Sequence, residues 1–347
     1  MKKRCIVATV ICAGVFVVLL VFFSRLTEPK YASASREGNL IAEYYRETDK
    51  DNRHDVIFVG DCEAYSAFVP PVIYEEYGIR SFVRGSPSQS IAQSYFLILE
   101  TLKYEKPRAI VLSVYALSKS EPQREAYSRM TLDGMRLSGE KVRAVLESCD
   151  GGESTLSYFI PLLRFHSRIY ELEAEDLEYL FSRPRVSHNG YFMQGGIASA
   201  EPDYYHGESN AQTELPSENL AYLNQILEVC RENEVELILV KSPISSWRYP
   251  WYDGWEEKIK EFAEQNSLEY YNLIKYSAEI GIDPARDSYD GGFHLNVYGA
   301  EKTSRFFGEI LLSRHGIRGK EEEIWDGKIR EYYKERNEKT NENNREN

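Results

Sequence analysis

The sequence predicts an α/β fold built around a largely parallel sheet, preceded by one transmembrane helix. Short apolar, β-branched runs alternate with segments of helical periodicity, which is the pattern of parallel strands joined by right-handed helical crossovers. A charge-free apolar stretch stands close to the N-terminus. With 347 residues, 42% of them hydrophobic, the chain is long enough for one large or two small globular domains, which excludes a disordered or fibrous protein.

The N-terminal segment predicts a membrane anchor. Residues 1–4 are a basic start, and residues 5–23 carry no charge over a length that spans a bilayer as a helix. A buried core helix rarely lacks a polar face over such a length. Basic residues ahead of the span favour a cytoplasmic N-terminus, so we expect a single-pass protein of the cell membrane with an extracellular C-terminal domain. A cleavable signal peptide is the competing interpretation, but Ala32-Ser33-Ala34, the nearest small-x-small pattern, lies well past the apolar stretch.

The predicted elements follow in order. Residues 24–53 are polar, and we expect a stalk there with a short helix near residues 40–45. The α/β domain is expected over residues 54–317. Its predicted strands lie at residues 55–60, 80–83, 109–114, 236–240 and 269–271. Its predicted helices lie at residues 88–104, 220–233, 255–265 and 299–314, where apolar side chains recur at helical spacing.

Two segments break the alternation. Residues 118–215 separate the third and fourth predicted strands, and they combine helical stretches with a Gly- and Tyr-rich loop, so we expect a large, mostly helical insertion. Residues 318–347 carry mixed charge and end in a run of Asn and Glu. We therefore expect a charged, disordered tail that buries no more than one turn around Trp325.

The charge, the cysteines and the absence of ligand motifs exclude several kinds of partner and cofactor. The formal net charge of −13 argues against nucleic acid, because phosphate binding needs clustered Lys and Arg. Three cysteines lie beyond the apolar stretch, far apart and odd in number, so no disulfide framework is indicated. The sequence shows neither metal-ligand spacing nor a phosphate-binding loop, and we expect no metal and no cofactor.

Two loops that follow predicted strands carry candidate functional residues. Ligands bind at the carboxyl ends of parallel strands. After the first strand, Asp61 can cap a helix and Cys62 would stand at its N-terminus, where the helix dipole favours a thiolate. After the second strand, backbone N–H groups near Gly85 and the amide of Gln89 can hold an oxyanion. The plainer alternatives are a small buried cysteine in a strand-to-helix turn and a helix N-cap near a proline.

The third candidate loop precedes the last predicted helix. It reads Asp287-Ser-Tyr-Asp290-Gly-Gly-Phe-His294-Leu-Asn296. A histidine behind two carboxylates is how a general base and its orienting acid are presented to a nucleophile elsewhere in a chain. A lone histidine is more often structural, but here it completes an order of nucleophile, oxyanion loop, acid and base along the sequence.

These motifs resemble the SGNH/GDSL hydrolase superfamily. Gly60-Asp61-Cys62 after the first strand, and Asp290 with His294 before the last helix, match the family's Gly-Asp-Ser and Asp-x-x-His, with Cys for Ser and one extra residue in the second motif. The likeness spans residues 55–314 and is strongest to membrane-anchored SGNH-like proteins of Gram-positive bacteria. Ser113-Val-Tyr115 stands where the family has a Gly-x-Asn oxyanion motif.

The resemblance implies a fold and an activity. The fold is a three-layer, flavodoxin-like parallel sheet, the SGNH hydrolase fold. The activity is that of an acyl esterase or O-acyltransferase on a cell-surface glycan or related envelope polymer, with a membrane-bound acyltransferase as a candidate partner. Cys62 would attack the acyl carbonyl, His294 would take its proton, and Asp290 or Asp287 would orient the ring. The oxyanion and substrate-binding residues are expected to be Asp61, Gly85, Gln89 and Asn296.

Other interpretations stay open at this point. The cysteine in place of serine and the lengthened acid–base spacing also suit a catalytically inactive SGNH-fold protein that binds glycan or scaffolds a membrane partner. The aromatic residues Trp247, Tyr249, Trp251, Tyr252 and Trp255 either stack on sugar rings or pack on one another. His166 and Arg168 either face the cleft or tie the insertion to the sheet.

Overall fold

The computed structural model shows five parallel strands in one sheet. It describes residues 2–29, 33–50, 52–119, 124–149, 152–182, 184–200, 214–244, 253–320 and 322–346. The strands are β1 Val56–Gly60, β2 Ser81–Gly85, β3 Ala109–Ser113, β4 Glu236–Lys241 and β5 Glu269–Asn272. Their order is β2-β1-β3-β4-β5, and each neighbouring pair is parallel. This is the flavodoxin-like order, so the predicted sheet is confirmed.

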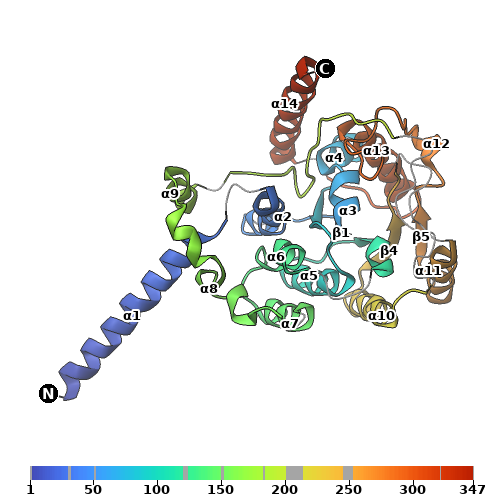
Figure 1. Ribbon diagram of the computed structural model, residues 1–347. Helices are drawn as coiled ribbons and strands as arrows, with labels where there is room; N and C mark the ends of the chain where they lie inside the picture. Colours follow the sequence, from blue (N-terminus) through green and yellow to red (C-terminus); the bar gives the residue numbers. More distant parts are fainter. Residues whose placement is uncertain are drawn as a thin grey trace.

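Helices cover both faces of the sheet (Figure 1). On one face lie α5 Ile91–Tyr104, α10 Ser217–Glu232 and α11 Asp253–Asn266, packed on alternate strand residues such as Ile57. On the other lie α3 Cys62–Ala67, α4 Pro70–Tyr77 and α13 Val297–Ser313, packed on residues such as Phe58. The short helix α12 Ser277–Ile280 precedes α13. The three-layer α/β prediction is confirmed, and the apolar runs of the strands reflect burial on both sides.

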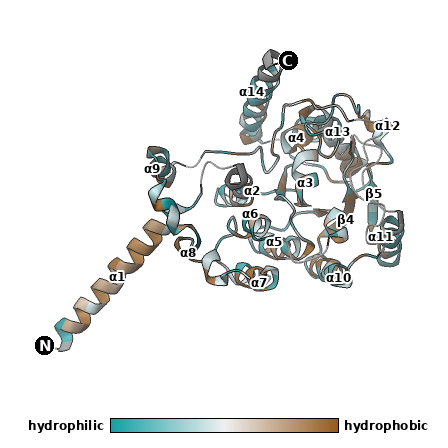
Figure 2. Cartoon of the chain, in the orientation of Figure 1, coloured by the Kyte–Doolittle hydropathy of each residue, from teal (hydrophilic) through white to brown (hydrophobic). Residues whose placement is uncertain are grey.

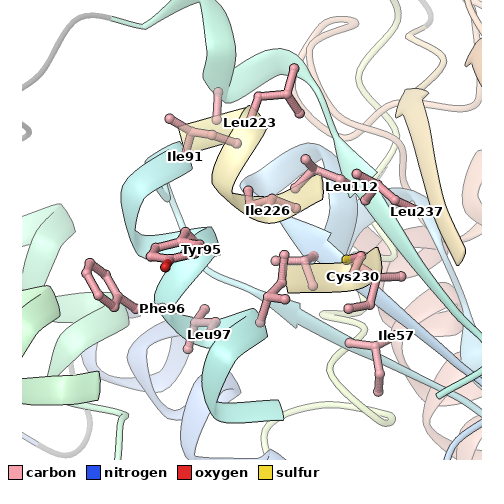
Figure 3. Packing of buried hydrophobic residues seen from close by; sticks show 14 of the residues in the cluster. Ile57, Ile91, Tyr95, Phe96, Leu97, Leu112, Leu223, Ile226, Cys230 and Leu237 are labelled. Atoms are coloured by element: carbon pink, nitrogen blue, oxygen red, sulfur yellow. The ribbon is translucent and has the colours of Figure 1, made fainter. Parts of the chain in front are cut away.

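Hydrophobic side chains of α5 and α10 pack together on this side of the sheet (Figure 3). Ile91 and Leu97 of α5 belong to the same cluster as Leu223 and Ile226 of α10, and all four are fully buried. Cys230 lies in the same cluster, and burial raises the pKa of its thiol to about 12. That cysteine is therefore a small core residue.

The segment between β3 and β4 is the predicted helical insertion. It contains η1 Tyr115–Ser118, α6 Glu125–Leu132, α7 Gly139–Ser148, η2 Thr155–Tyr158, α8 Leu162–Phe165, η3 His166–Tyr170 and α9 Ala174–Phe181. His166 is exposed to solvent, and the Arg168 guanidinium donates to the carbonyl oxygens of Thr27 and Glu28 at 3.0 and 2.7 Å. Neither expected role of these two residues is observed, because Arg168 ties the insertion to the end of the first helix.

The N-terminal helix α1 Lys2–Thr27 is long and apolar enough to cross a membrane (Figure 2). The next helix, α2 Ser33–Thr48, replaces the expected stalk with a packed element. Leu40, Ile41 and Tyr44 of α2 are fully buried, and the Tyr44 hydroxyl donates to Glu105 Oε1 at 2.7 Å. The short helix near residues 40–45 was predicted, but its burial against the domain was not.

A buried polar network joins α2, β2 and α5. The guanidinium of Arg84 lies 2.9 Å from Glu100 Oε2, and both side chains are almost completely inaccessible to solvent. Arg84 also donates to Thr101 Oγ1 at 2.9 Å, and the Tyr45 hydroxyl donates to Glu100. The charge is tolerated in the core because each of these partners satisfies part of it.

The C-terminal segment forms α14 Glu323–Glu346, so the expectation of a disordered tail is wrong for the described residues. Trp325 is buried and stacks on Tyr74 of α4 with ring centroids 4.7 Å apart. Seven residues on, Tyr332 is fully buried and donates to Glu301 Oε1 at 2.8 Å. Two aromatic residues on one face of the helix anchor a segment whose mean composition looks too polar to fold.

Replacing Trp325 by alanine is expected to destabilise the whole domain. Loss of a buried indole costs about 3–5 kcal/mol of unfolding free energy. Urea denaturation of the full chain in detergent micelles measures this change. Ile324→Ala is the matched control, because Ile324 is 45% exposed and its loss should cost less than about 0.5 kcal/mol. A loss as small for Trp325→Ala as for Ile324→Ala would show that α14 does not contribute to the core.

Candidate active site

The candidate site is built where β1 meets β3 at the carboxyl edge of the sheet. A Cβ atom on Gly60 would lie 2.4 Å from Cβ of Ser113, so only glycine lets the two strand ends approach this closely. Directly after this contact, Asp61 caps α3, and its Oδ1 accepts from the backbone N–H of Glu63 at 3.2 Å. Cys62 is therefore the first residue of α3, half-buried at the helix N-terminus.

His294 and Asp290, which the sequence predicted as base and orienting acid, are in direct contact. Nδ1 of His294 lies 2.5 Å from Oδ2 of Asp290. The other carboxylate oxygen of Asp290 accepts from the backbone N–H groups of Phe293 and His294 at 3.2 and 2.9 Å. The ring of Tyr289 stacks on the imidazole, with 5.8 Å between the ring centroids and 16° between the ring planes. Three contacts thus orient His294, and the bond from Phe293 holds Asp290 in place.

Asp287, the alternative partner, points elsewhere. Its Oδ2 lies 2.6 Å from Nζ of Lys302 and also accepts from the backbone N–H of Asp283. The extra residue between Asp290 and His294 is absorbed by Gly291 and Gly292, whose φ angles of +81° and +108° give a tight turn that other residues rarely adopt. The pairing left open by the sequence is therefore Asp290 with His294.

The electrostatics of the site connect His294 to Cys62 as well as to Asp290. Burial disfavours the charged ring most strongly, but the negative charge of a Cys62 thiolate and hydrogen bonds with Asp290 and Cys62 outweigh it. Together they raise the pKa of His294 from 6.5 to about 11. Burial also acts to raise the pKa of Asp290, yet its bonds with His294 hold that pKa below its ordinary value. The ring therefore interacts with the carboxylate of Asp290 and with the sulfur of Cys62.

Lys119 is a site residue that the sequence reasoning missed. Its ammonium lies 2.5 Å from Oδ2 of Asp61 and 4.5 Å from the ring centroid of Tyr115. Burial disfavours its charge, but the charges of Asp61 and Cys62 outweigh burial and raise the pKa of Lys119 above its ordinary value. A fixed positive charge therefore stands beside the thiol. The sequence feature that could have identified Lys119 is its position after the third predicted strand, at the same carboxyl edge of the sheet as the other candidate loops.

A buried ion pair holds the helix that carries Cys62. Both carboxylate oxygens of Glu63 lie 2.9 Å from Nζ of Lys241, the last residue of β4, and both side chains are buried. The hydroxyl of Ser242 donates to the backbone carbonyl of Glu63 at 3.2 Å. These contacts fix the start of α3 against β4, a strand two places away from β1 in the sheet.

The predicted oxyanion and substrate-binding residues divide into two groups. Gly85 pairs with Gly60 in the sheet, and a Cβ on it would lie 3.1 Å from the Gly60 carbonyl oxygen, so the second loop does border the first. Asp61 also lies in the site. Gln89 and Asn296 do not offer free amides, and these two expectations need correction.

The Gln89 and Asn296 side chains are structural, and both are fully buried. Nε2 of Gln89 donates to Oγ of Ser94 at 3.0 Å and to the Arg84 carbonyl oxygen at 3.4 Å, which uses both of its hydrogens. Oδ1 of Asn296 caps α13, and its Nδ2 donates to the carbonyl oxygens of Gly196 and Arg286. Neither amide is therefore available as a side-chain donor to an oxyanion.

Two further expectations concern ligands. Of the aromatic run after β4, Trp255 is buried in the core with α11, and the others lie outside the described residues. Among the described residues, no group of three or more His, Cys, Asp and Glu side chains is arranged to hold a metal ion.

Comparison with known proteins gives distant structural likenesses. No family model and no curated protein matches the chain. It is similar to a GDSL-like lipase of Bacteroides thetaiotaomicron, with 12% identity and a TM-score of 0.36 over 80% of this chain and 100% of that one. It is also similar to a candidate acylhydrolase of Bacteroides fragilis, with 11% identity and a TM-score of 0.37 over 79% and 97% of the two chains. Likenesses this distant do not establish a family, and the function must be argued from the chain's own residues.

The imidazole of His294 is expected to stay protonated at neutral pH. Because its pKa is about 11 in the folded chain and 6.5 ordinarily, the proton stabilises the fold fully below pH 6.5. That stabilisation is lost as the pH rises toward 11. Nitrogen-15 NMR of the imidazole over this range measures the titration. Cys62→Ala and Asp290→Asn should each lower the pKa by about 1 to 3. An ordinary histidine titration in the unaltered protein would contradict the arrangement.

Proposed function

We propose that this chain is a membrane-anchored, extracytoplasmic acyl esterase or O-acyltransferase that acts on a cell-surface glycan or related envelope polymer. The observation that carries the proposal is the position of the His294 ring, which is bonded to Asp290 at 2.5 Å and interacts with Cys62. Nucleophile, base and orienting acid come from two loops at one edge of the sheet. The apolar length of α1 supports the anchor.

The reaction would proceed in two acyl transfers. The Cys62 thiolate attacks the acyl carbonyl carbon of an ester, and the C–O bond to the leaving alcohol breaks as His294 donates its proton to that oxygen. The product is a thioester on Cys62. A water molecule or an acceptor hydroxyl then attacks the thioester and gives its proton to His294, and the thiolate leaves. Water makes the protein a hydrolase and a polymer hydroxyl makes it a transferase.

The surroundings of Cys62 suit this chemistry. Backbone N–H groups near Cys62 and Gly85 would hold the carbonyl oxygen as it becomes negative, and the ammonium of Lys119, bonded to Asp61, would add a positive charge there. Asp290 holds one tautomer and orientation of the ring. A membrane-bound acyltransferase is the proposed source of acyl groups, because a neighbour in the same membrane keeps donor and acceptor close.

A binding or scaffolding role is the second candidate function. It is favoured by the internal use of both Gln89 and Asn296 amides, which leaves the site without a side-chain amide donor among the residues first expected to supply one. In that case Cys62 would remain a thiol and would not be acylated.

Cys62 is expected to react far faster than other cysteines of the chain. Full-length protein in detergent micelles is treated in parallel with an activated acyl ester, a fluorophosphonate and iodoacetamide, and adducts are located by mass spectrometry. Cys149 is the matched control, since it is also half-buried and burial raises its pKa to about 11. We expect at least about tenfold faster labelling of Cys62 at pH 7, slowed by His294→Ala. Equal rates at the two cysteines, with no acyl adduct, would favour the binding role.

Asp290→Asn should lower kcat for a soluble ester by about 10² to 10⁴-fold, because the neutral amide cannot hold the charged ring in place. Asp287→Asn is the matched control in the same loop. It should leave kcat close to that of the unaltered protein while lowering its thermal stability, since Lys302 loses its partner. Steady-state kinetics with a chromogenic acyl ester measures both. Similar losses in the two variants would show that the loop acts only as a structural unit.

A further inference from the structure

Exposed apolar side chains are concentrated in the insertion. Apart from α1, the described part of the chain exposes eleven large hydrophobic side chains. Nine of them lie between residues 137 and 181, and the other two are Ile197 and Ile324. Elsewhere the domain hides such groups in two well-packed layers. A soluble surface has little reason to gather apolar groups in one segment, so this segment meets an apolar partner.

The partner is indicated by what the segment is attached to. The backbone N–H of Leu162 donates to Oγ of Ser24 at 3.4 Å, and Arg168 binds the carbonyl oxygens of Thr27 and Glu28. The helices α8 and α9 and the turn η3 all pack against α1. Figure 1 shows them grouped around the end of α1 that joins the domain. The apolar segment therefore lies beside the last turn of the proposed membrane span.

Helix geometry places these residues at the depth of the lipid headgroups. The apolar stretch ends at Phe23, and the polar Ser24 is the next residue, about 1.5 Å further along the axis. The polar interface of a bilayer is about 5–7 Å thick on each side. Because Leu162 is bonded to Ser24, its neighbour Leu163 lies at or inside this interface when α1 spans the membrane.

The side chains themselves suit the interface. The exposed fractions are 51% for Leu163, 92% for Tyr170 and 88% for Phe181, and Ile169 and Leu177 are also exposed. Tyrosine is enriched where one side of a ring meets hydrocarbon and the other meets water. We call Leu163, Ile169, Tyr170, Leu177 and Phe181 the collar.

A cavity at the same level adds to this surface. It has a volume of about 620 Å³ and is lined by Leu20 and Val21 of α1, by α2, and by the loop that leads into α7. Leu20 and Val21 belong to the charge-free stretch, so the cavity opens at the boundary between hydrocarbon and water.

We propose that the collar inserts into the outer interface of the bilayer, with membrane lipids as its partner. This inference rests on the membrane anchor of the proposed function and goes beyond it. The domain is then attached to the membrane twice, through α1 and through the collar. Two attachments fix the tilt of the sheet and hold Cys62 at a set height above the lipid surface.

Photolabelling from the lipid tests the collar. The full-length chain is reconstituted in vesicles of phosphatidylcholine and phosphatidylglycerol that contain a phospholipid with a diazirine near its glycerol carbons. After illumination, labelled peptides are identified by mass spectrometry. We expect label on α1 and on peptides that contain Leu163, Tyr170 and Phe181, at about tenfold the level of the peptide that contains Ile324, an exposed apolar residue on α14.

A triple variant, Leu163→Ser, Tyr170→Ser and Phe181→Ser, removes apolar groups that are exposed in the folded chain. The variant should keep the label on α1 and retain hydrolysis of a soluble ester. The amount of label on the collar peptides should fall about tenfold. Ile324→Ser is its matched control. Label on α1 without label on the collar would overturn the proposal and leave the anchor intact. Label on neither would overturn both, and covalent dimers formed through the collar would assign the surface to a second copy of the chain.

Discussion

The close approach of β1 and β3 at Gly60 is the constraint on which the site depends. No side chain fits between Gly60 and Ser113, so β1 ends against its neighbour and the chain turns at once into α3. The turn places Cys62 at a helix N-terminus and Asp61 where it can meet Lys119 from the end of β3. The Glu63 and Lys241 pair then fastens the same helix to β4. The absence of a side chain at Gly60 therefore lets residues at the ends of β1, β3 and β4 lie close to Cys62.

The charges around that sulfur serve position more than stability. A buried ion pair such as Glu63 with Lys241 recovers in mutual attraction roughly what it loses in hydration, so its net contribution to the free energy of folding is small. The pair instead fixes the position of α3, because moving either residue would leave a buried charge without its partner. The same holds for Asp290, whose carboxylate is fully occupied by His294 and the turn around it. The site is rigid because each buried charge is paired with a defined partner and would be costly in any other position.

Sequence patterns predicted the helices and strands in which apolar side chains recur at a regular spacing. They predicted less where the structure depends on the contacts of a single residue. The strands and the crossover helices follow from periodic burial. The loops with Cys62 and His294 were found because parallel strands bring their ends together. Gln89 and Asn296 were misread, because an amide that caps a helix and an amide that binds substrate look alike in a sequence. The fold of α14 was hidden, since Trp325 and Tyr332 are two apolar residues in a highly charged stretch.

The two ends of the ordered domain are interlocked. Nζ of Lys328 on α14 lies 2.6 Å from Oε2 of Glu47 on α2, and Arg185 joins Glu47 to Glu331 of α14. The ribosome makes α2 before the sheet and α14 after it. The packing around α4 is therefore completed only once α14 has been made. A chain that stopped before α14 would hold every residue of the candidate site but would lack the helix whose Trp325 stacks on Tyr74 of α4.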